Sequence, residues 1–162
     1  MDKATFLRRT ELAVRAFYEN DIKLIELEVH ERTIAHRFAI YLEDMFRGWN
    51  IDCEYNRLGR ITKELDGVRE SDSQRATDRI YPDIIIHERG SEDRNNLGVI
   101  EIKARREIEA CDRQKLELMT RRTEDDKFKY EFGAFFAFYS DKCKWILFVS
   151  GREDGHGIIE VG

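Results

Sequence analysis

Three residues on two hydrophobic segments could do chemistry together. Asp83 stands at the start of one apolar segment, and Glu101 and Lys103 lie within the next, residues 97–104. Side chains alternate along a β-strand, so Glu101 and Lys103 are expected on one face. Charges among apolar neighbours are expensive to bury unless they are paired or bind a cation. If the two strands are neighbours, Asp83 can approach Glu101, and a divalent metal ion would relieve their repulsion.

The reaction that uses such a set is hydrolysis of a phosphodiester bond. Two carboxylates hold Mg²⁺ through oxygen, and the metal polarises the scissile phosphate and lowers the pKa of a bound water. A lysine beside them can orient or help to deprotonate that water, or neutralise charge in the transition state. We therefore predict Asp83, Glu101 and Lys103 as catalytic residues, with Asp83 and Glu101 as ligands of Mg²⁺ or Mn²⁺.

The pattern of an acidic residue two positions before a lysine is not specific by itself. It occurs three times, at Asp21–Lys23, Glu101–Lys103 and Asp125–Lys127, in a chain that is 38% charged. Only the middle copy lies in a hydrophobic strand and follows a Pro-Asp strand start. The alternative interpretation is a surface ion pair of Glu101 and Lys103 at a sheet edge, and both interpretations stay open at this point.

The elements that must position these residues follow from periodicity and turn signals. Pro82 is the only proline in the chain and belongs at the first position of a strand, because it cannot donate to a sheet ladder. The segment 57–80 is polar and could be a loop, a distorted hairpin, a substrate flap or a dimer arm. The remaining pattern predicts helices at 4–19, 30–47 and 109–120 and strands at 51–55, 81–87, 97–104, 132–139, 145–150 and 158–161. This order predicts a mixed α/β domain with one central sheet flanked by helices.

Two further carboxylates could join the site. Glu31 falls on the apolar stripe of the helix 30–47, and it could be an extra metal ligand or a first-turn residue that suits the helix dipole. Glu54 follows a short strand and could reach the site, but a structural ion pair with Arg57 is the favoured interpretation.

This layout resembles the PD-(D/E)XK nuclease superfamily, the fold of type II restriction endonucleases and Holliday-junction resolvases. The family pattern opens the second core strand with Pro-Asp, here Pro82-Asp83, and carries Glu-x-Lys in the third, here Glu101-Ile102-Lys103, with 17 residues between Asp83 and Glu101. Residues 30–37 and 52–57 also resemble a small family of uncharacterised microbial proteins within this superfamily.

The resemblance implies a restriction endonuclease-like αβββαβ core and an active site of Asp83, Glu101 and Lys103. It implies Glu31 as the acidic residue of the first core helix, and a third helix from which Gln114 and Lys115 face the site. We expect a single domain over residues 1–162, with an extra helix in an N-terminal extension 1–29, a core 30–150 and a C-terminal hairpin or tail 151–162. Nothing in the chain matches the recognition module of a restriction enzyme.

Composition limits the partners. The net charge is −5, so any contact with nucleic acid must come from a local site rather than from bulk charge. No apolar run reaches the roughly 20 residues of a membrane span, the N-terminus has no apolar signal core, and three widely spaced cysteines suggest reduced thiols in the cytoplasm. Arg105, Arg106 and Arg113 could neutralise phosphates, or they could belong to a solvated helix of mixed charge.

The leading hypothesis is therefore a metal-dependent endonuclease that acts on nucleic acid, with DNA as the expected substrate. Two alternatives stay open. One is an inactive nuclease-like module that binds nucleic acid or a protein, and the other is an accessory subunit of a defence or repair complex. The partner would be nucleic acid, a second copy of the chain or a larger protein, and no membrane is expected.

Overall fold

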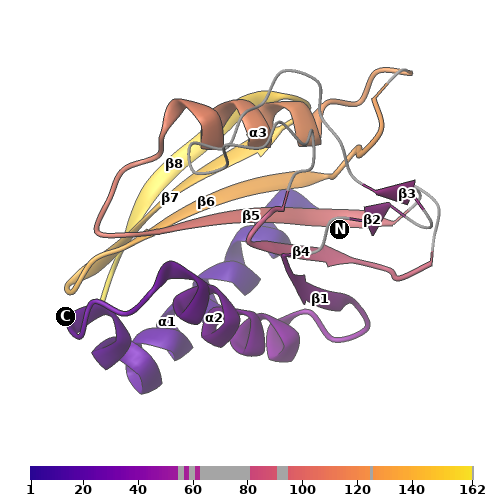
Figure 1. Ribbon diagram of the computed structural model, residues 1–162. Helices are drawn as coiled ribbons and strands as arrows, with labels where there is room; N and C mark the ends of the chain where they lie inside the picture. Colours follow the sequence, from indigo (N-terminus) through magenta and orange to yellow (C-terminus); the bar gives the residue numbers. More distant parts are fainter. Residues whose placement is uncertain (55–56, 59–60, 63–80, 91–94, 125, 162) are drawn as a thin grey trace.

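The protein is described by a computed structural model, which covers residues 1–54, 57–58, 61–62, 81–90, 95–124 and 126–161 (Figure 1). The predicted polar segment 57–80 lies mostly outside these ranges. The helices are α1 (Lys3–Glu26), α2 (Glu31–Met45) and α3 (Ala110–Thr120). The strands are β1 (Asn50–Cys53), β2 (Arg57–Leu58), β3 (Ile61–Thr62), β4 (Ile84–His87), β5 (Asn96–Ala104), β6 (Phe132–Phe138), β7 (Lys142–Val149) and β8 (Arg152–Glu160).

Six of these strands form one open mixed sheet in the order β1-β4-β5-β6-β7-β8, and β2 pairs with β3 alone. Only β5 and β6 run parallel, and the other neighbouring pairs of the large sheet are antiparallel. The helix α3 makes the crossover from β5 to β6, as a parallel pair requires. The fold is therefore α/β, with α1 and α2 on one face of the sheet and α3 on the other (Figure 1).

The larger core lies between the sheet and the pair α1–α2. Alternate residues of β4 and β5, such as Ile84, Ile86 and Ile100, face this layer and are fully buried. The α1 side chain of Phe6 stacks on Phe132 of β6, with ring centroids 4.5 Å apart. The segment expected as an N-terminal extension is thus an integral layer of the core.

The opposite face carries a smaller core under α3, which includes Ile85, Val99, Leu116 and Phe135. The last turn of α3 comes very close to β6 at Gly133, where a Cβ atom would lie 2.8 Å from the Thr120 methyl group. The missing side chain therefore lets α3 settle directly on the sheet. This close approach determines how far side chains of α3 stand above β5.

Several element boundaries differ from the sequence prediction, chiefly those of α1, β4 and β8. The first helix continues beyond residue 19 to Glu26, because the chain only kinks at Asp21, whose φ of −129° and ψ of 15° are not helical. The Asp21 carboxylate accepts hydrogen bonds from Arg37 and Tyr41 of α2, which tie the kink to the neighbouring helix. The strand β4 begins at Ile84, after the Pro-Asp pair.

The third difference is at the C-terminal end. The last strand, expected at 158–161, is longer than predicted, since β8 already begins at Arg152 and contains both Gly155 and Gly157. The indole ring of Trp145 explains one of these glycines, because a Cβ atom on Gly157 would lie 2.8 Å from it. Of the two alternatives for this segment, hairpin or tail, the structure has the hairpin, because β8 pairs antiparallel with β7 at the edge of the large sheet.

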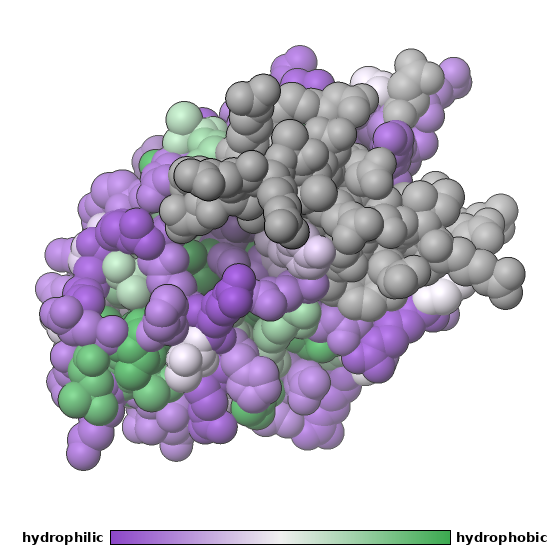
Figure 2. All heavy atoms as spheres, in the orientation of Figure 1, coloured by the Kyte–Doolittle hydropathy of each residue, from purple (hydrophilic) through white to green (hydrophobic). Residues whose placement is uncertain are grey.

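The surface agrees with the charge-rich composition. Hydrophilic side chains cover most of the described part of the face seen in Figure 2. None of the helices within the described residues combines the length and the apolar character that crossing a bilayer requires.

Candidate active site

The pairing of β4 with β5 brings the predicted carboxylates together. Ile84 lies opposite Ile100 in this antiparallel pair, so the preceding Asp83 comes to the level of Glu101. Ile85 and Val99 belong to the core under α3. Asp83 lies at an even spacing from Ile85, and Glu101 and Lys103 lie at even spacings from Val99, so their side chains are on the same face of the sheet. The three residues predicted from the motif thus gather on the sheet face that α3 covers.

The side chain of Asp83 is held by the next strand. Its Oδ2 atom accepts a hydrogen bond of 2.7 Å from the backbone N–H of Ile102. Burial raises the pKa of Asp83 to about 6, although this hydrogen bond and the charges of Lys115 and Lys103 oppose the shift. The site therefore holds a carboxylate that ionises readily only near neutral pH or beside an added positive charge.

Glu101 is the most enclosed acid of the site, with 3% of the residue exposed. Its Oε2 atom lies 3.0 Å from the Nζ atom of Lys115 on α3, while its Oε1 atom is buried without a hydrogen-bond partner among the described residues. Burial, followed by the neighbouring charge of Asp83, raises the pKa of Glu101 well above its ordinary value. A buried acceptor without a donor, next to a second carboxylate, suits the oxygen coordination of a divalent cation.

Lys103 lies between carboxylates from two different helices. Its Nζ atom is 3.6 Å from Asp112 Oδ2 on α3 and 3.8 Å from Glu31 Oε2 on α2. Burial alone would lower the pKa of Lys103, but these two carboxylates outweigh it and raise the pKa above its ordinary value. Lys103 is therefore a cation at neutral pH, which fits a role in orienting water or stabilising negative charge better than a role as a free base.

Glu31 satisfies both interpretations of its position in the sequence. It lies in the first turn of α2, and it also reaches the end of β5, where its Oε1 atom accepts hydrogen bonds from Ala104 N at 3.1 Å and Arg106 at 2.8 Å. The same carboxylate approaches Lys103 through its other oxygen. Glu31 thus borders the site and is already engaged by basic and backbone donors.

Of the three residues predicted to support the site, one contacts it. Lys115 packs against Glu101, whereas Gln114 is exposed to solvent on α3. Glu54 forms an ion pair of 2.7 Å with Arg32 of α2, and the side chain of Arg57, its expected partner, lies outside the described residues. The structure therefore selects Lys115 from the two candidates on α3 as the residue that contacts the site.

The three arginines predicted to bind phosphate lie in two different places. Arg105 pairs with Glu28 and Arg106 with Glu31, both beside the end of β5. Arg113 instead pairs with Glu153 of β8 at 2.6 Å and lies over the ring of Phe148. Arg113 is thus held over the far strands, while Arg105 and Arg106 stay close to the candidate site.

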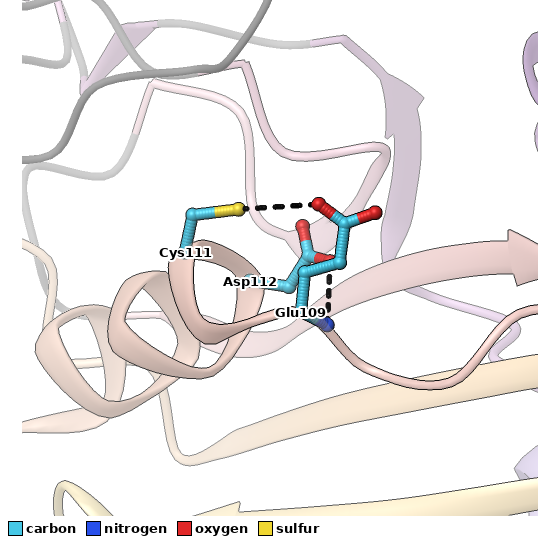
Figure 3. Close-up of side chains that lie close together, drawn as sticks. All are labelled: Glu109, Cys111 and Asp112. Carbon is cyan, nitrogen blue, oxygen red and sulfur yellow. Dashed lines mark hydrogen bonds between the residues drawn. The ribbon is translucent and has the colours of Figure 1, made fainter.

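Asp112 is a site residue that the sequence analysis did not identify. It is 4% exposed, approaches Lys103, and accepts a hydrogen bond from Glu109 N at the start of α3. Figure 3 shows it beside Glu109 and Cys111, and one ligand atom from each of these three residues lies within 4.8 Å of the others. The available signal was its place in the first turn of a helix, which by itself indicates only a capping carboxylate.

An open cleft of about 810 Å³ borders this group of side chains. Asp83 forms part of its wall, so this carboxylate is reached from the cleft. The other lining residues come from the start of α2 and the end of β5, and they are Val29, His30, Glu31, Arg32, Ala104, Arg105 and Arg106. The cleft is thus lined by both basic side chains and carboxylates.

No family model, no curated protein and no solved structure matches this chain. The likeness of Pro82-Asp83 and Glu101-Ile102-Lys103 to a nuclease signature therefore stays a resemblance of motifs.

Proposed function

We propose that this chain is a Mg²⁺- or Mn²⁺-dependent endonuclease of the PD-(D/E)XK type that hydrolyses phosphodiester bonds in DNA. The observation that carries the proposal is the buried pair of carboxylates. Asp83 and Glu101 lie on adjacent strands, and Glu101 keeps one oxygen without a partner among the described residues. An ammonium group, Lys103, follows on the same face, and Asp83 lines an open cleft together with Arg105 and Arg106.

The order of the elements supports a restriction endonuclease-like core. The αβββαβ order that the motifs imply is found along the chain in the elements α2, β1, β4, β5, α3 and β6. Within this order the Pro-Asp pair precedes β4, and Glu-x-Lys lies in β5. The two short strands β2 and β3 are an insertion between β1 and β4.

Asp83 and Glu101 are the residues that would hold the cation, and Glu31 is the further carboxylate within reach of the same end of the sheet. When bound, a divalent cation supplies polarisation of the scissile phosphate and acidification of a water. Lys103, held as an ammonium between Asp112 and Glu31, would donate a hydrogen bond to the attacking water or to a phosphate oxygen. Arg106 would stabilise the phosphate backbone if it exchanges Glu31 for a phosphate oxygen.

A second candidate is a nuclease-like module that binds nucleic acid or a protein without cleaving it, or that serves a larger complex. The observation in its favour is the neutralisation of the arginines at the cleft. Arg32, Arg105 and Arg106 each pair with a glutamate, at distances of 2.7, 2.5 and 2.8 Å, in a chain of net charge −5. Such a surface provides little general attraction for DNA.

Cleavage of a substrate panel tests the proposal. The panel contains supercoiled plasmid, linear duplex, single-stranded DNA, branched DNA and RNA, each with Mg²⁺, Mn²⁺ or EDTA. We expect metal-dependent cleavage that the Lys103→Ala variant reduces by about 100-fold or more. The matched control is Lys23→Ala, which removes an exposed lysine from the same acidic-x-Lys pattern on α1.

Cleavage that persists in an Asp83→Ala plus Lys103→Ala variant would overturn the assignment of the site. Absence of cleavage together with absence of Mn²⁺ binding by the unmodified chain would favour the binding module. Absence of cleavage with Mn²⁺ bound would favour the accessory subunit, which co-purification with a larger partner would then identify.

A further inference from the structure

The contact between Lys115 and Glu101 is the most enclosed ion pair among the described residues. The Nζ and Oε2 atoms are 3.0 Å apart, and the two side chains are 6% and 3% exposed. Lys115 reaches the site from α3, whereas Glu101 lies in β5, so the pair joins the helix to the sheet directly over the candidate metal ligands. Neither catalysis by Lys103 nor binding of a first cation requires it.

Stability alone is a weak explanation for this pair. Desolvating two charges is costly, and apolar residues of similar volume in the same place are often as stable or more stable. The core under α3 is otherwise apolar around Leu116 and Phe135, so a lysine here stands out from its surroundings. This position and its acid partner point to a role in the charge balance of the site.

The charges of the described residues around the cleft favour a single cation. Among these residues, the four carboxylates of Asp83, Glu101, Asp112 and Glu31 contribute −4 when ionised, and the two ammonium groups of Lys103 and Lys115 contribute +2, which leaves −2. Arg106 contacts both Glu31 and Glu109, and counting Arg106 together with Glu109 adds no net charge to this sum. One divalent cation brings this group to zero, whereas two would leave it at +2.

The geometry around Glu101 agrees with this balance. A second cation that used Glu101 Oε2 as a ligand, at about 2.0–2.6 Å, would lie on the side where the ammonium group of Lys115 already lies. Two positive centres beside one oxygen in a buried site repel each other strongly. Of the two Glu101 oxygens, Oε1, which has no hydrogen-bond partner among the described residues, is thus the one left for a metal ion.

We infer that Lys115 takes the place of a second metal ion, so that the site binds a single divalent cation on Asp83 and Glu101. Lys115 is then a positioning residue, which holds one oxygen of Glu101 and leaves the other to the cation. The inference rests on the proposed metal-dependent function and deepens it by assigning the stoichiometry of the metal and the residue that determines it.

Binding of Mn²⁺ alone, without nucleic acid, tests the inference in the full chain. Isothermal titration calorimetry gives the number of ions, and electron paramagnetic resonance distinguishes an isolated Mn²⁺ from a spin-coupled pair. We expect one uncoupled ion in the unmodified chain, two coupled ions in Lys115→Gln, and one ion again in Lys115→Arg, which keeps the charge. Lys115→Met serves as a second neutral variant if Lys115→Gln does not fold.

The outcomes separate the inference from the function on which it rests. Two ions in the unmodified chain, or one ion with unchanged affinity in both neutral variants, would overturn the role of Lys115 and leave the metal-dependent function intact. A chain that binds no Mn²⁺, or binds it equally well in Asp83→Asn, would overturn both. An increase from one to two ions on neutralising Lys115 would support both.

Discussion

The backbone N–H of Ile102 donates a hydrogen bond of 2.7 Å to Asp83 Oδ2, so the residue between Glu101 and Lys103 holds the first acid of the site. This bond connects the Pro-Asp turn before β4 to the middle of the Glu-x-Lys segment in β5. The two halves of the motif, far apart in sequence, are therefore joined by this hydrogen bond as well as by the pairing of β4 with β5. Any change that shifts the register of β4 against β5 would break it.

The contribution of Asp83 to the stability of the metal-free protein should fall as the pH rises from about 4 to about 6, while acids whose pKa is lowered by a partner, such as Asp52 beside Arg89, act in the opposite direction. Burial raises the pKa of Asp83 from 3.8 to about 6, so between these values the folded chain keeps a proton that the unfolded chain has released. That stabilisation is complete below the lower value and is lost as the pH rises through the upper one, and Glu101, whose pKa is also raised, acts in the same direction. Melting temperatures by circular dichroism in EDTA, from pH 4 to 7.5, measure the slope.

The Asp83→Asn variant isolates the share of Asp83 in this slope. We expect a flatter pH dependence and a melting temperature at pH 7 that is above that of the unmodified chain, because a neutral amide avoids the desolvation of a charge. Mn²⁺ should raise the melting temperature of the unmodified chain and have little effect on the variant. An unchanged slope in Asp83→Asn would show that this acid ionises normally in the fold.

The Arg106→Ala variant should weaken binding of DNA and lower its salt dependence. Arg106 lies beside Glu31 at the cleft, where a phosphate can replace the carboxylate, and loss of one phosphate contact lowers the slope of log K against log salt by about 0.9. Fluorescence anisotropy with a labelled duplex in EDTA provides the measurement. Arg113→Ala is the control, because Arg113 pairs with Glu153 over the far strands. Equal losses in the two variants would argue against the cleft as the contact surface.

The Gly133→Ala variant should destabilise the fold by about 1–3 kcal/mol. The added Cβ atom would lie 2.8 Å from the Thr120 methyl group, and Thr120 is held by hydrogen bonds to Leu116 O and from Gly151 N. This clash exceeds the roughly 0.4–1 kcal/mol that a Gly→Ala change gains from the unfolded state. Urea denaturation measures the difference. Gly155→Ala, where the nearest atom is at 3.8 Å, should be close to neutral, and equal effects at both glycines would contradict the close approach of α3.

The Phe6→Ala variant should lower the free energy of unfolding by about 3–5 kcal/mol. Phe6 is fully buried and stacks on Phe132, so its loss opens a cavity between α1 and the sheet. Leu12→Ala removes an apolar side chain from the same helix that is 43% exposed, and it should have a small effect. A small effect of Phe6→Ala, measured by the same denaturation, would indicate that α1 is a dispensable extension.

The residue pattern was enough to predict most of the local structure. The apolar run after Pro82, and the alternation that puts Glu101 and Lys103 on one face, depend only on neighbouring residues, and the structure has both. The end of α1 could not be predicted, because Asn20 and Asp21 resemble a stop signal. The contacts of Asp21 with Arg37 and Tyr41 of α2 accompany its continuation.

The composition of the site was decided by packing between segments far apart in the chain. The sequence placed Asp83 at a strand start, but only the pairing of β4 with β5 brings it to the level of Glu101. Similarly, α3 carries both Gln114 and Lys115, and the docking of the helix on Gly133 and β5 leaves the first exposed and buries the second against Glu101. Alternation and helical periodicity are local properties and follow from the residues alone, whereas strand pairing and helix docking depend on how side chains fill the space between layers.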